Sequence, residues 1–362
     1  MSDLSRERVE AVLAEYVDPY LEKDLVSARA IKNIAIDDDA LTVTVSLGFP
    51  ASGYAKTLQQ ALTERLAPIA GAAKVNVEVQ WKVVAHAVQQ GVDAFKNVKN
   101  IVAVASGKGG VGKSTVAVNL ALALAADGAS VGMLDADIYG PSQPRMLGAS
   151  MQPESKDGRS LEPVMGHDIQ SMSIGYLVDE ETPMIWRGPM VTQALEQLLK
   201  DTNWRDLDYL IVDLPPGTGD TQLTLSQKIP VSGAIIITTP QDISLLDARK
   251  GLKMFEKVKI PILGIVENMS IHICSQCGHE EHIFGKGGGV RMSEEQGVNF
   301  LGGLPLDVSV CTDTDNGQPT VVKDPDSPIA KQFREIARRM SAKLSLQAKD
   351  FSKAFPSIVI SE

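Results

Sequence analysis

Hydrophobic and polar positions follow two different patterns along the chain, and the change between them divides it. Residues 75–83, VNVEVQWKV, alternate apolar and polar side chains, as a strand with one buried face does. Residues 31–47, IKNIAIDDDALTVTVSL, predict two strands around an Asp-rich turn. Residues 4–16 and 57–69 are predicted to be helical. These elements predict a small α+β unit over residues 1–84, in the order helix, strand, strand, helix, strand.

The pattern changes after a stretch without clear periodicity, residues 85–99, which is predicted to be a linker. Short apolar runs with little alternation then follow, and such runs are typical of strands covered on both faces. Helical segments separate them, which predicts an α/β fold with a mostly parallel sheet flanked by helices over residues 100–347. A helix around 328–344 is the last element, and residues 348–362 form a tail without signal. The apolar runs are VGMLD, YLIVD, GAIIIT and ILGIVEN.

Composition narrows the class of protein. Hydrophobic residues make up 44% of the 362 residues and charged residues 22%, which is ordinary for a soluble globular protein. A formal net charge of -10 disfavours general binding to nucleic acid or to anionic lipid. The N-terminus lacks the apolar segment of a secretory signal, and no apolar run approaches the ~20 residues that span a bilayer. With three cysteines and no disulfide framework, we expect a cytoplasmic protein that binds neither nucleic acid nor, stably, membranes.

A glycine-rich loop carries the clearest chemical signal. The stretch GKGGVGKS fits the phosphate-loop pattern G-x-x-x-x-G-K-[ST], and it lies between a predicted strand and a predicted helix. Its glycines let backbone N–H groups surround an anion, and the helix N-terminus adds a positive partial charge. Lys113 is expected to reach the β- and γ-phosphates, and Ser114 to bind Mg²⁺. The predicted nucleotide-binding residues here are Gly107, Lys108, Gly109, Gly110, Val111, Gly112, Lys113, Ser114 and Thr115.

Three aspartates follow predicted strands. Asp135 and Asp137 come at the end of one strand, in MLDADIYGPSQP, and Asp213 ends another, in YLIVDLPPGTGD. Ligands gather at the carboxyl ends of strands in open α/β sheets, and carboxylates there suit Mg²⁺. We therefore predict that Ser114, Asp135 and Asp213 support magnesium. The alternative for each aspartate is a helix cap.

The second lysine of the loop, Lys108, makes the sequence resemble the deviant Walker A ATPases, which include the nitrogenase iron protein, MinD and ParA. The resemblance implies that Lys108 reaches the nucleotide of a partner subunit and that Asp137 orients the attacking water, so that Lys108, Lys113 and Asp137 are catalytic. It further implies that the backbone of Gly217 senses the γ-phosphate. In VENMS it makes Asn268 the contact to adenine; an ordinary turn asparagine is the alternative.

A C-x-x-C pair, Cys274 and Cys277, follows the last predicted strand, and such a turn brings two sulfurs to one metal centre. Two thiolates alone do not complete a four-coordinate site. The nearby His279 and His282 could complete a zinc site, although zinc fingers separate their ligand pairs by about a dozen residues. A redox dithiol and a purely structural pair are further readings. The third cysteine, Cys311, is expected to be a small buried hydrophobe.

The run C-x-x-C-G-H…I-F-G after a deviant Walker A region resembles the Mrp/ApbC/NBP35 iron–sulfur carrier ATPases. This implies a homodimer in which Cys274 and Cys277 of each chain bind one bridging iron–sulfur cluster, [4Fe–4S] by resemblance. It further implies slow, Mg²⁺-dependent ATP hydrolysis, and delivery of the cluster to apo iron–sulfur proteins, with cluster assembly factors as further partners. Residues 1–84 resemble the MIP18-type domain that precedes many such ATPases. That domain often has a cysteine where this chain reads LGFPASGYAK, so a thiol role there is not expected.

A positioning ATPase of the MinD/ParA type, acting on membrane or DNA with the C-x-x-C as a structural zinc site, is the rival hypothesis. Such proteins end in a basic amphipathic helix, and the helix at 328–344 carries five basic residues. We expect instead that its apolar stripe packs on the sheet and that its basic residues face solvent. A third reading, an adaptor that binds ATP without turnover, would need the loss of Lys113 or Asp137, and both are present. The basic residues are Lys331, Arg334, Arg338, Arg339 and Lys343.

Overall fold

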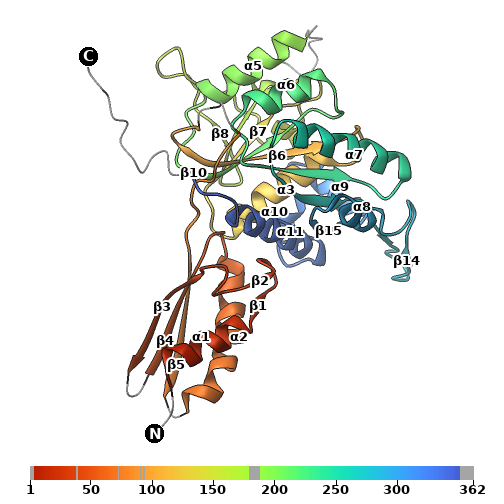
Figure 1. Cartoon of the computed structure of the whole chain (residues 1–362). Helices are drawn as coiled ribbons and strands as arrows, with labels where there is room; N and C mark the ends of the chain where they lie inside the picture. Colours follow the sequence, from red (N-terminus) through yellow and green to blue (C-terminus); the bar gives the residue numbers. More distant parts are fainter. Residues whose placement is uncertain are drawn as a thin grey trace, which may run out of the picture.

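The computed structural model describes residues 4–37, 40–71, 73–89, 92, 94–178 and 188–350. They form two packed units that lie one below the other in Figure 1, each with its own hydrophobic core. No helix in these ranges is long and apolar enough to cross a bilayer. The predicted Asp-rich turn at 38–39 and the tail from 351 lie outside the described residues.

The N-terminal unit is a three-stranded sheet covered on one face by two helices. β3 (Ile31–Asp37) runs antiparallel to β4 (Ala40–Leu47), and β4 runs parallel to β5 (Lys74–Trp81). In β4 every second side chain is fully buried, because that face lies against the helices while the other face is partly exposed. This confirms the predicted strand order. The remaining elements are α1 (Arg6–Ala14), β1 (Val17–Asp18), β2 (Lys23–Asp24) and α2 (Ser52–Ala70).

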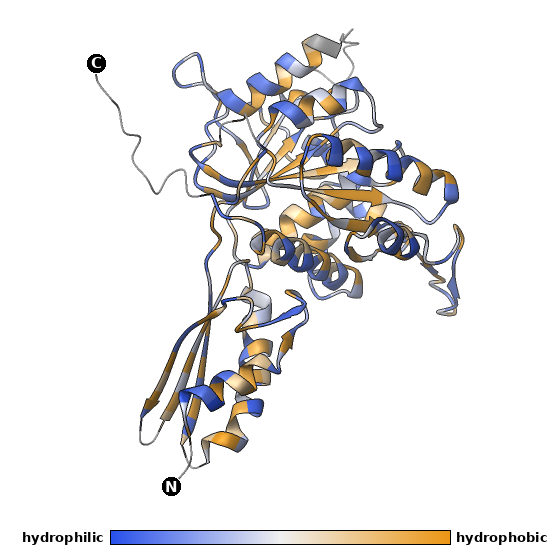
Figure 2. Cartoon of the chain, viewed as in Figure 1, coloured by the Kyte–Doolittle hydropathy of each residue, from blue (hydrophilic) through white to orange (hydrophobic). Residues whose placement is uncertain are grey.

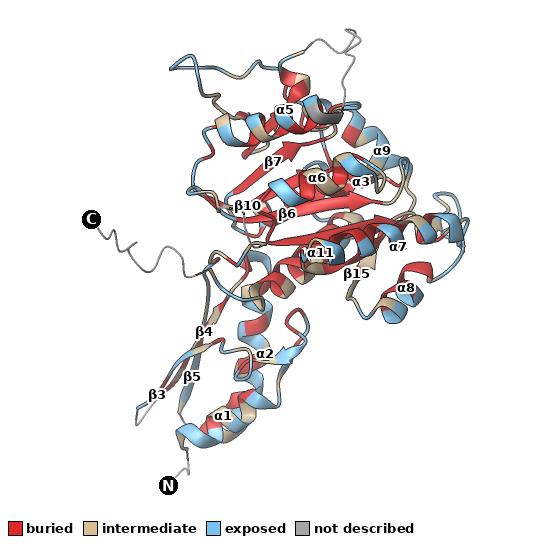
Figure 3. Cartoon of the chain, turned by 45° about the horizontal axis from the view of Figure 1, so that its top comes forward, coloured by how far each residue is buried: buried red, intermediate tan, exposed pale blue. Residues whose placement is uncertain are grey.

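The second unit is built on an eight-stranded sheet in the order β15-β12-β11-β6-β10-β7-β9-β8, parallel except where β8 pairs with β9. The strands form a hydrophobic band in Figure 2, and in Figure 3 they are buried between helices on both faces. This confirms the predicted α/β class and the four apolar runs as strands. The strands are β6 (Val98–Ser106), β7 (Val131–Asp135), β8 (Val164–Gly166), β9 (Ile169–Ser173), β10 (Leu207–Asp213), β11 (Gly233–Thr238), β12 (Ile262–Glu267) and β15 (Phe300–Gly303).

Helices connect these strands. The helix that follows the phosphate loop, α3, is mostly apolar. It is buried over most of its length because it packs between the sheet and the last helix, α11. A small hairpin, β13 (His272–Ile273) and β14 (Glu280–Glu281), projects after β12. The helices are α3 (Lys113–Ala126), α4 (Gln143–Met146), η1 (Ile174–Tyr176), α5 (Gly188–Asp201), α6 (Asp220–Lys228), α7 (Asp242–Lys257), α8 (Gly288–Gln296), α9 (Val308–Asp315), α10 (Thr320–Lys323) and α11 (Pro328–Ser345).

The segment between the units packs more closely than a free linker would. His86 is buried, its backbone N–H donates to the side-chain oxygen of Asn100 at 3.1 Å, and it forms a bridge with Lys349. The N–H of Ala87 donates to the carbonyl of Ala348 at 2.9 Å. The start of the predicted linker and the start of the predicted tail therefore hold each other through backbone hydrogen bonds, which the sequence pattern does not reveal.

The C-terminal helix confirms one expectation and corrects another. The apolar stripe of α11, including Phe333 and Met340, is buried in the core as predicted. Its basic residues do not all face solvent, however, because the N-terminal unit packs on this helix. Arg338 is buried in an ion pair with Asp127, and Lys343 pairs with Glu22 at 2.6 Å.

Candidate functional site

The glycine-rich loop follows β6 and opens α3, as its motif requires. Gly107 lies against the backbone of α7, and a Cβ atom there would be 2.2 Å from the carbonyl carbon of Asp247. Gly112 has a φ of +77°, and a Cβ there would be 2.3 Å from Nδ2 of Asn268. Only glycine fits both positions, so the close approach of the loop to its neighbours depends on these two residues.

Lys113 and Asp213 form a buried ion pair at the centre of the site. The lysine is the first residue of α3, the aspartate ends β10, and Asp213 is completely buried. Gln143 donates from Nε2 to Oδ2 of Asp213 at 2.9 Å and to the carbonyl of Ser114 at 3.2 Å. The predicted phosphate lysine Lys113 and the predicted magnesium residues Asp213 and Ser114 therefore lie together.

Asp135 lies beside Asp213, because β7 and β10 are neighbouring parallel strands in which these two residues pair. Its carboxylate accepts backbone N–H groups of Ser142 and Gln143, each at 3.0 Å, and the hydroxyl of Ser173 at 3.1 Å. Burial, and secondly the negative charge of Asp213, raise the pKa of Asp135 to about 7.

This donor set fits a magnesium ion. Asp135 and Asp213 are two carboxylates at adjacent strand ends, the hydroxyl of Ser114 lies nearby, and Lys113 is the cation paired with Asp213. Hard oxygen donors are the ligands that Mg²⁺ prefers, and a divalent cation would offset the mutual repulsion of the carboxylates. Asp137 lies two residues beyond Asp135 and is partly buried, and its pKa is raised, chiefly by burial.

Three further predicted residues border the loop. Asn268 follows β12 and donates from Nδ2 to the carbonyl of Val111 at 2.9 Å, so its amide braces the loop. Lys108 forms no ion pair within the described part of the chain. The N–H of Gly217, whose φ is +103°, donates to the carbonyl of Ser106 at 3.0 Å. The adenine, partner-subunit and γ-phosphate roles of these residues stay predictions.

Cys274 and Cys277 lie at the tip of the β13–β14 hairpin. The N–H of Cys274 donates to the carbonyl of His279 at 2.9 Å, and that of Gly278 donates to the carbonyl of Cys274 at 2.8 Å. Cys277 is exposed and Cys274 is half-buried. Backbone N–H groups of Gln276 and Cys277 lower the pKa of Cys274, which favours the thiolate that binds metal.

The histidines do not complete a metal site within one chain. Across the described residues, no group of three or more His, Cys, Asp or Glu side chains is arranged to hold a metal ion. His279 is exposed, and Nδ1 of His282 lies 2.9 Å from the carbonyl of Ser270. The hairpin thus presents two thiols to the outside of the chain.

Cys311 is not the buried hydrophobe that the sequence suggested. It is exposed on α9, with its sulfur 3.7 Å from a carboxylate oxygen of Asp315. That negative charge is the main cause that raises the pKa of Cys311. The prediction was wrong because the apolar residues flanking Cys311 lie on a helix face that is open to solvent.

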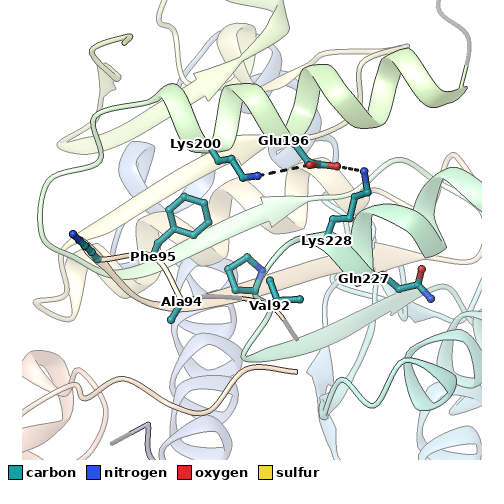
Figure 4. Close-up of a pocket in the computed structure, with 9 residues that line it drawn as sticks. Val92, Ala94, Phe95, Glu196, Lys200, Gln227 and Lys228 are labelled. Atoms are coloured by element: carbon teal, nitrogen blue, oxygen red, sulfur yellow. Dashed lines mark ion pairs between the residues drawn. The ribbon is translucent and has the colours of Figure 1, made fainter. Parts of the chain in front are cut away.

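A cavity of about 500 Å³ lies near the amino ends of the central strands, opposite the end of the sheet that bears the phosphate loop. Phe95 lines it, and Glu196 of α5 lies there between Lys200 and Lys228, as Figure 4 shows. The cavity borders the amino ends of β6 and β11, whereas the loop follows the carboxyl end of β6. It is therefore separate from the nucleotide site.

Sequence reasoning missed several residues that complete the site. Gln143 and Ser173 hold the two carboxylates, and Glu267 accepts the N–H of Gly289 at the start of α8. Gln143 lies only eight positions after Asp135, but a glutamine at the start of a short helix carries no signal of its own. The hydrogen bond from Ser173, at the end of β9, to Asp135, at the end of β7, depends on how the two strands pair and is visible only in the fold.

Comparison with known families gives two matches. Residues 97–341 match the ParA family model, described as NUBPL iron-transfer P-loop NTPase. Residues 6–79 match the model described as iron–sulfur cluster assembly protein. Together the two matches cover most of both structural units.

Individual relatives agree with these models. The chain is 49% identical over 348 residues to the iron–sulfur cluster carrier protein of Salmonella typhimurium, which covers 96% of this chain and 94% of that protein. It is 49% identical over 252 residues to the iron–sulfur cluster transfer protein NUBPL of Mus musculus, which covers 69% of this chain and 79% of that protein.

Two solved structures share the fold of the second unit. A nucleotide-binding protein of Archaeoglobus fulgidus in complex with ADP has a TM-score of 0.56 and 35% identity, and the match covers 65% of this chain and 91% of that one. The cell division ATPase MinD of Pyrococcus furiosus has a TM-score of 0.51 and 22% identity, over 66% of this chain and 97% of that one, which supports the fold alone.

Proposed function

The chain belongs to the NUBPL iron-transfer P-loop NTPase family, as the resemblance to the iron–sulfur carrier ATPases predicted, and on this premise we propose that it is an ATP-hydrolysing carrier of iron–sulfur clusters. It binds a cluster through Cys274 and Cys277 and delivers it to apo iron–sulfur proteins. The observation that supports this best is the outward-facing thiol pair on a hairpin that follows β12. The turn after β12 also contacts the phosphate loop.

The nucleotide half of the proposal rests on the loop and its carboxylates. The backbone N–H groups of residues 107–115 hold the phosphates, and Lys113 leaves Asp213 to neutralise the β- and γ-oxygens. Ser114, Asp135 and Asp213 would hold Mg²⁺, which would supply positive charge beside the phosphates, and Asp137 orients the attacking water. Asn268 contacts the adenine through the amide atoms of its side chain that do not bind the carbonyl of Val111. Hydrolysis is slow until a partner supplies Lys108.

The cluster half requires two chains. Two thiolates fill half of a four-coordinate site, and an iron–sulfur cluster takes four. A homodimer that brings two hairpins together supplies Cys₄, which suits one [4Fe–4S] cluster per dimer. Exposed apolar side chains lie on α7, on the hairpin and the segment after it, and on α8, and a second copy of the chain would cover them. They are Ile243, Leu246, Ile273, Ile283 and Val290.

We further propose the division of the chain that its sequence predicted. Residues 1–84 form the MIP18-like unit, 85–99 the linker, 100–347 the ATPase unit with the thiol pair, and 348–362 the tail. The exposed thiols suit a reducing compartment, which makes the cytoplasm the proposed location. Recipient apoproteins and assembly factors are the proposed partners.

The positioning-ATPase hypothesis has less support. Its membrane-binding helix would be α11, but the apolar stripe of that helix is buried in the core. Arg338 and Lys343 of the same helix are paired with carboxylates. No apolar face of α11 is left for a lipid surface.

Anaerobic reconstitution with iron and sulfide tests the proposed function. We expect a broad absorption band in the visible range, about four iron atoms per dimer, and transfer of the cluster to an apo iron–sulfur protein. Replacement of Cys274 and Cys277 by serine removes all three. Binding of one zinc ion per chain, without the band, would overturn the carrier function in favour of a structural zinc site.

A further inference from the structure

The turn that follows β12 contacts the phosphate loop on one side and the cysteine hairpin on the other. Asn268 donates to the carbonyl of Val111 in the loop at 2.9 Å. Two residues later, the carbonyl of Ser270 accepts Nδ1 of His282, at the base of the hairpin, at 2.9 Å. Only Met269 separates the two contacts along the chain.

The loop side of this connection is tight. A Cβ at Gly112 would lie 2.3 Å from Nδ2 of Asn268 and 3.8 Å from the terminal carbon of Met269. Any movement of the loop as it closes on phosphates therefore reaches these two side chains directly. The backbone N–H of Asn268 donates to the carbonyl of Thr238 at 2.8 Å, which ties the start of the turn to the end of β11.

The turn itself has little freedom to absorb such a movement. Met269 has a φ of +56°, a conformation that a non-glycine residue adopts at some cost. Both the N–H and the hydroxyl of Ser270 donate to the carbonyl of Leu304, at 2.9 and 3.0 Å. A displacement of Asn268 is thus passed along the turn to the carbonyl of Ser270.

The hairpin side is also attached at its base, where the N–H of Leu306 donates to the carbonyl of Ile271 at 2.7 Å, and two histidines add further contacts. His282 holds β14 to Ser270, and Nδ1 of His272 lies 3.1 Å from the carbonyl of Leu306. The helix after the hairpin is held by Glu267, the residue just before Asn268, whose buried carboxylate accepts the N–H of Gly289. Within the described part of the chain, the thiols at the tip have no such contact with the body of the protein.

From this arrangement we propose that His282 is a positioning residue that couples occupancy of the phosphate loop to the placement of Cys274 and Cys277. The inference rests on the proposed carrier function, for which such a link lets the nucleotide control the lability of the cluster. It also assigns His282 a structural role in place of the zinc-ligand role considered from the sequence. A coupling of this kind acts in both directions, so a bound cluster changes nucleotide affinity by the same factor.

Alkylation of the iron-free chain tests this without any cluster. The rate at which N-ethylmaleimide modifies Cys274 and Cys277 is measured by mass spectrometry, with and without ADP, and Cys311 on α9 serves as an internal reference. ADP is chosen because its phosphates fill the loop without the γ-phosphate expected to promote dimerisation. We expect ADP to slow modification of the pair by about fivefold or more and to leave Cys311 unchanged.

Variants at two histidines supply the comparison. His282→Ala removes the contact with Ser270, and we expect the ADP effect to fall below about twofold while ADP affinity is unchanged. His282→Asn should keep the ADP effect, because its amide nitrogen takes the place of Nδ1. His282→Gln should lose the ADP effect, because its amide nitrogen takes the place of Nε2. His279→Ala, on the same hairpin but without such a contact, keeps the full effect.

The result that overturns the inference is an unchanged ADP effect in His282→Ala and His282→Gln, or no ADP effect in the wild-type chain. Either can occur while the wild-type chain still binds about four iron atoms per dimer, which leaves the carrier function intact. Conversely, a wild-type chain that binds no cluster removes the carrier function and leaves the alkylation result standing. The two failures are therefore distinguishable.

Discussion

Arg338 of α11 and Asp127 at the end of α3 form a two-point ion pair beneath the ring of Tyr20. The guanidinium donates to both carboxylate oxygens, at 2.5 and 3.0 Å, and lies 5.8 Å from the ring centroid. Tyr20 belongs to the N-terminal unit and donates its hydroxyl to Glu335 at 2.9 Å. The N-terminal unit is thus attached to the far end of the helix that begins at the phosphate loop.

Removal of one member of this pair should destabilise the protein strongly. In Arg338→Ala or Asp127→Ala a buried charge is left without its partner, which costs about 3–5 kcal/mol of unfolding free energy. The double replacement Arg338→Met/Asp127→Leu leaves no buried charge and is expected to lie within about 1–2 kcal/mol of wild type. Urea denaturation followed by tryptophan fluorescence measures both.

The exposed pair Lys253–Glu256 is the matched control, because its side chains are 68% and 48% exposed. Lys253→Ala should change the unfolding free energy by less than about 0.5 kcal/mol. If Arg338→Ala behaved like Lys253→Ala, the buried ion pair would contribute no more to stability than an exposed one does.

Lys113→Ala should abolish productive nucleotide binding. The ammonium group is the charge that the loop directs at the phosphates, and its loss is expected to weaken ADP binding by about a hundredfold or more. Isothermal titration calorimetry measures the change. Lys200→Ala is the control. Lys200 lines the cavity near the amino ends of the strands, away from the phosphate loop, so this variant should bind ADP as wild type does. Equal affinity in the two variants would contradict the placement of the nucleotide.

Lys108→Ala should separate binding from turnover. Lys108 has no ion pair within the described residues, so its loss should change ADP affinity by less than about threefold. If it acts on the nucleotide of a partner subunit, ATP turnover per chain falls by about a hundredfold or more. Steady-state hydrolysis at increasing protein concentration measures this, and wild-type turnover in the variant would rule out the partner-subunit role.

Gly112→Ala should destabilise the loop even without nucleotide. The added Cβ would meet Nδ2 of Asn268 at 2.3 Å, and the φ of +77° disfavours any side chain, so a loss of about 1–3 kcal/mol is expected. Gly109→Ala is the control, since nothing lies within 4 Å of its added Cβ. Thermal unfolding of both variants checks the contrast; similar midpoints would show that the loop adapts freely.

Cys274→Ser and Cys277→Ser should each remove the cluster, because a dimer of either variant offers two thiolates in place of four. Iron and sulfide content after anaerobic reconstitution measures the loss. Cys311→Ser should keep wild-type iron content, since Cys311 lies on α9, apart from the hairpin. Full iron content in a hairpin variant would mean that the cluster is held elsewhere.

The sequence gives strong signals for structural features that a single short segment of the chain forms by itself. The loop pattern around Lys113, the apolar strands ending in Asp135 and Asp213, and the spacing of Cys274 and Cys277 each depend on neighbours within about ten residues. Such features survive in the sequence because the chain itself places the groups. They were sufficient for the fold class and the family, and they supplied the candidate residues around which the site was described.

Contacts between distant segments could not be predicted in this way. Gln143 on Asp213, Ser270 against His282, and Arg338 on Asp127 join residues that the sequence separates by 70, 12 and 211 positions. Polar side chains of this kind have no periodicity, and their partners are chosen only when strands and helices pack. The exposure of Cys311 was misjudged for the same reason, because burial is a property of the packed elements and not of the residue.

The sequence by itself therefore determined what this protein is built to bind, because a phosphate loop and a thiol pair are made by short stretches of backbone. Only the tertiary structure decided how the two are connected. The parallel order of β6 and β12 in the sheet, separated by β11, brings the end of β12 against the loop. The physical reason is that a hydrogen bond between two segments needs both ends in place, and only packing of the whole sheet puts them there.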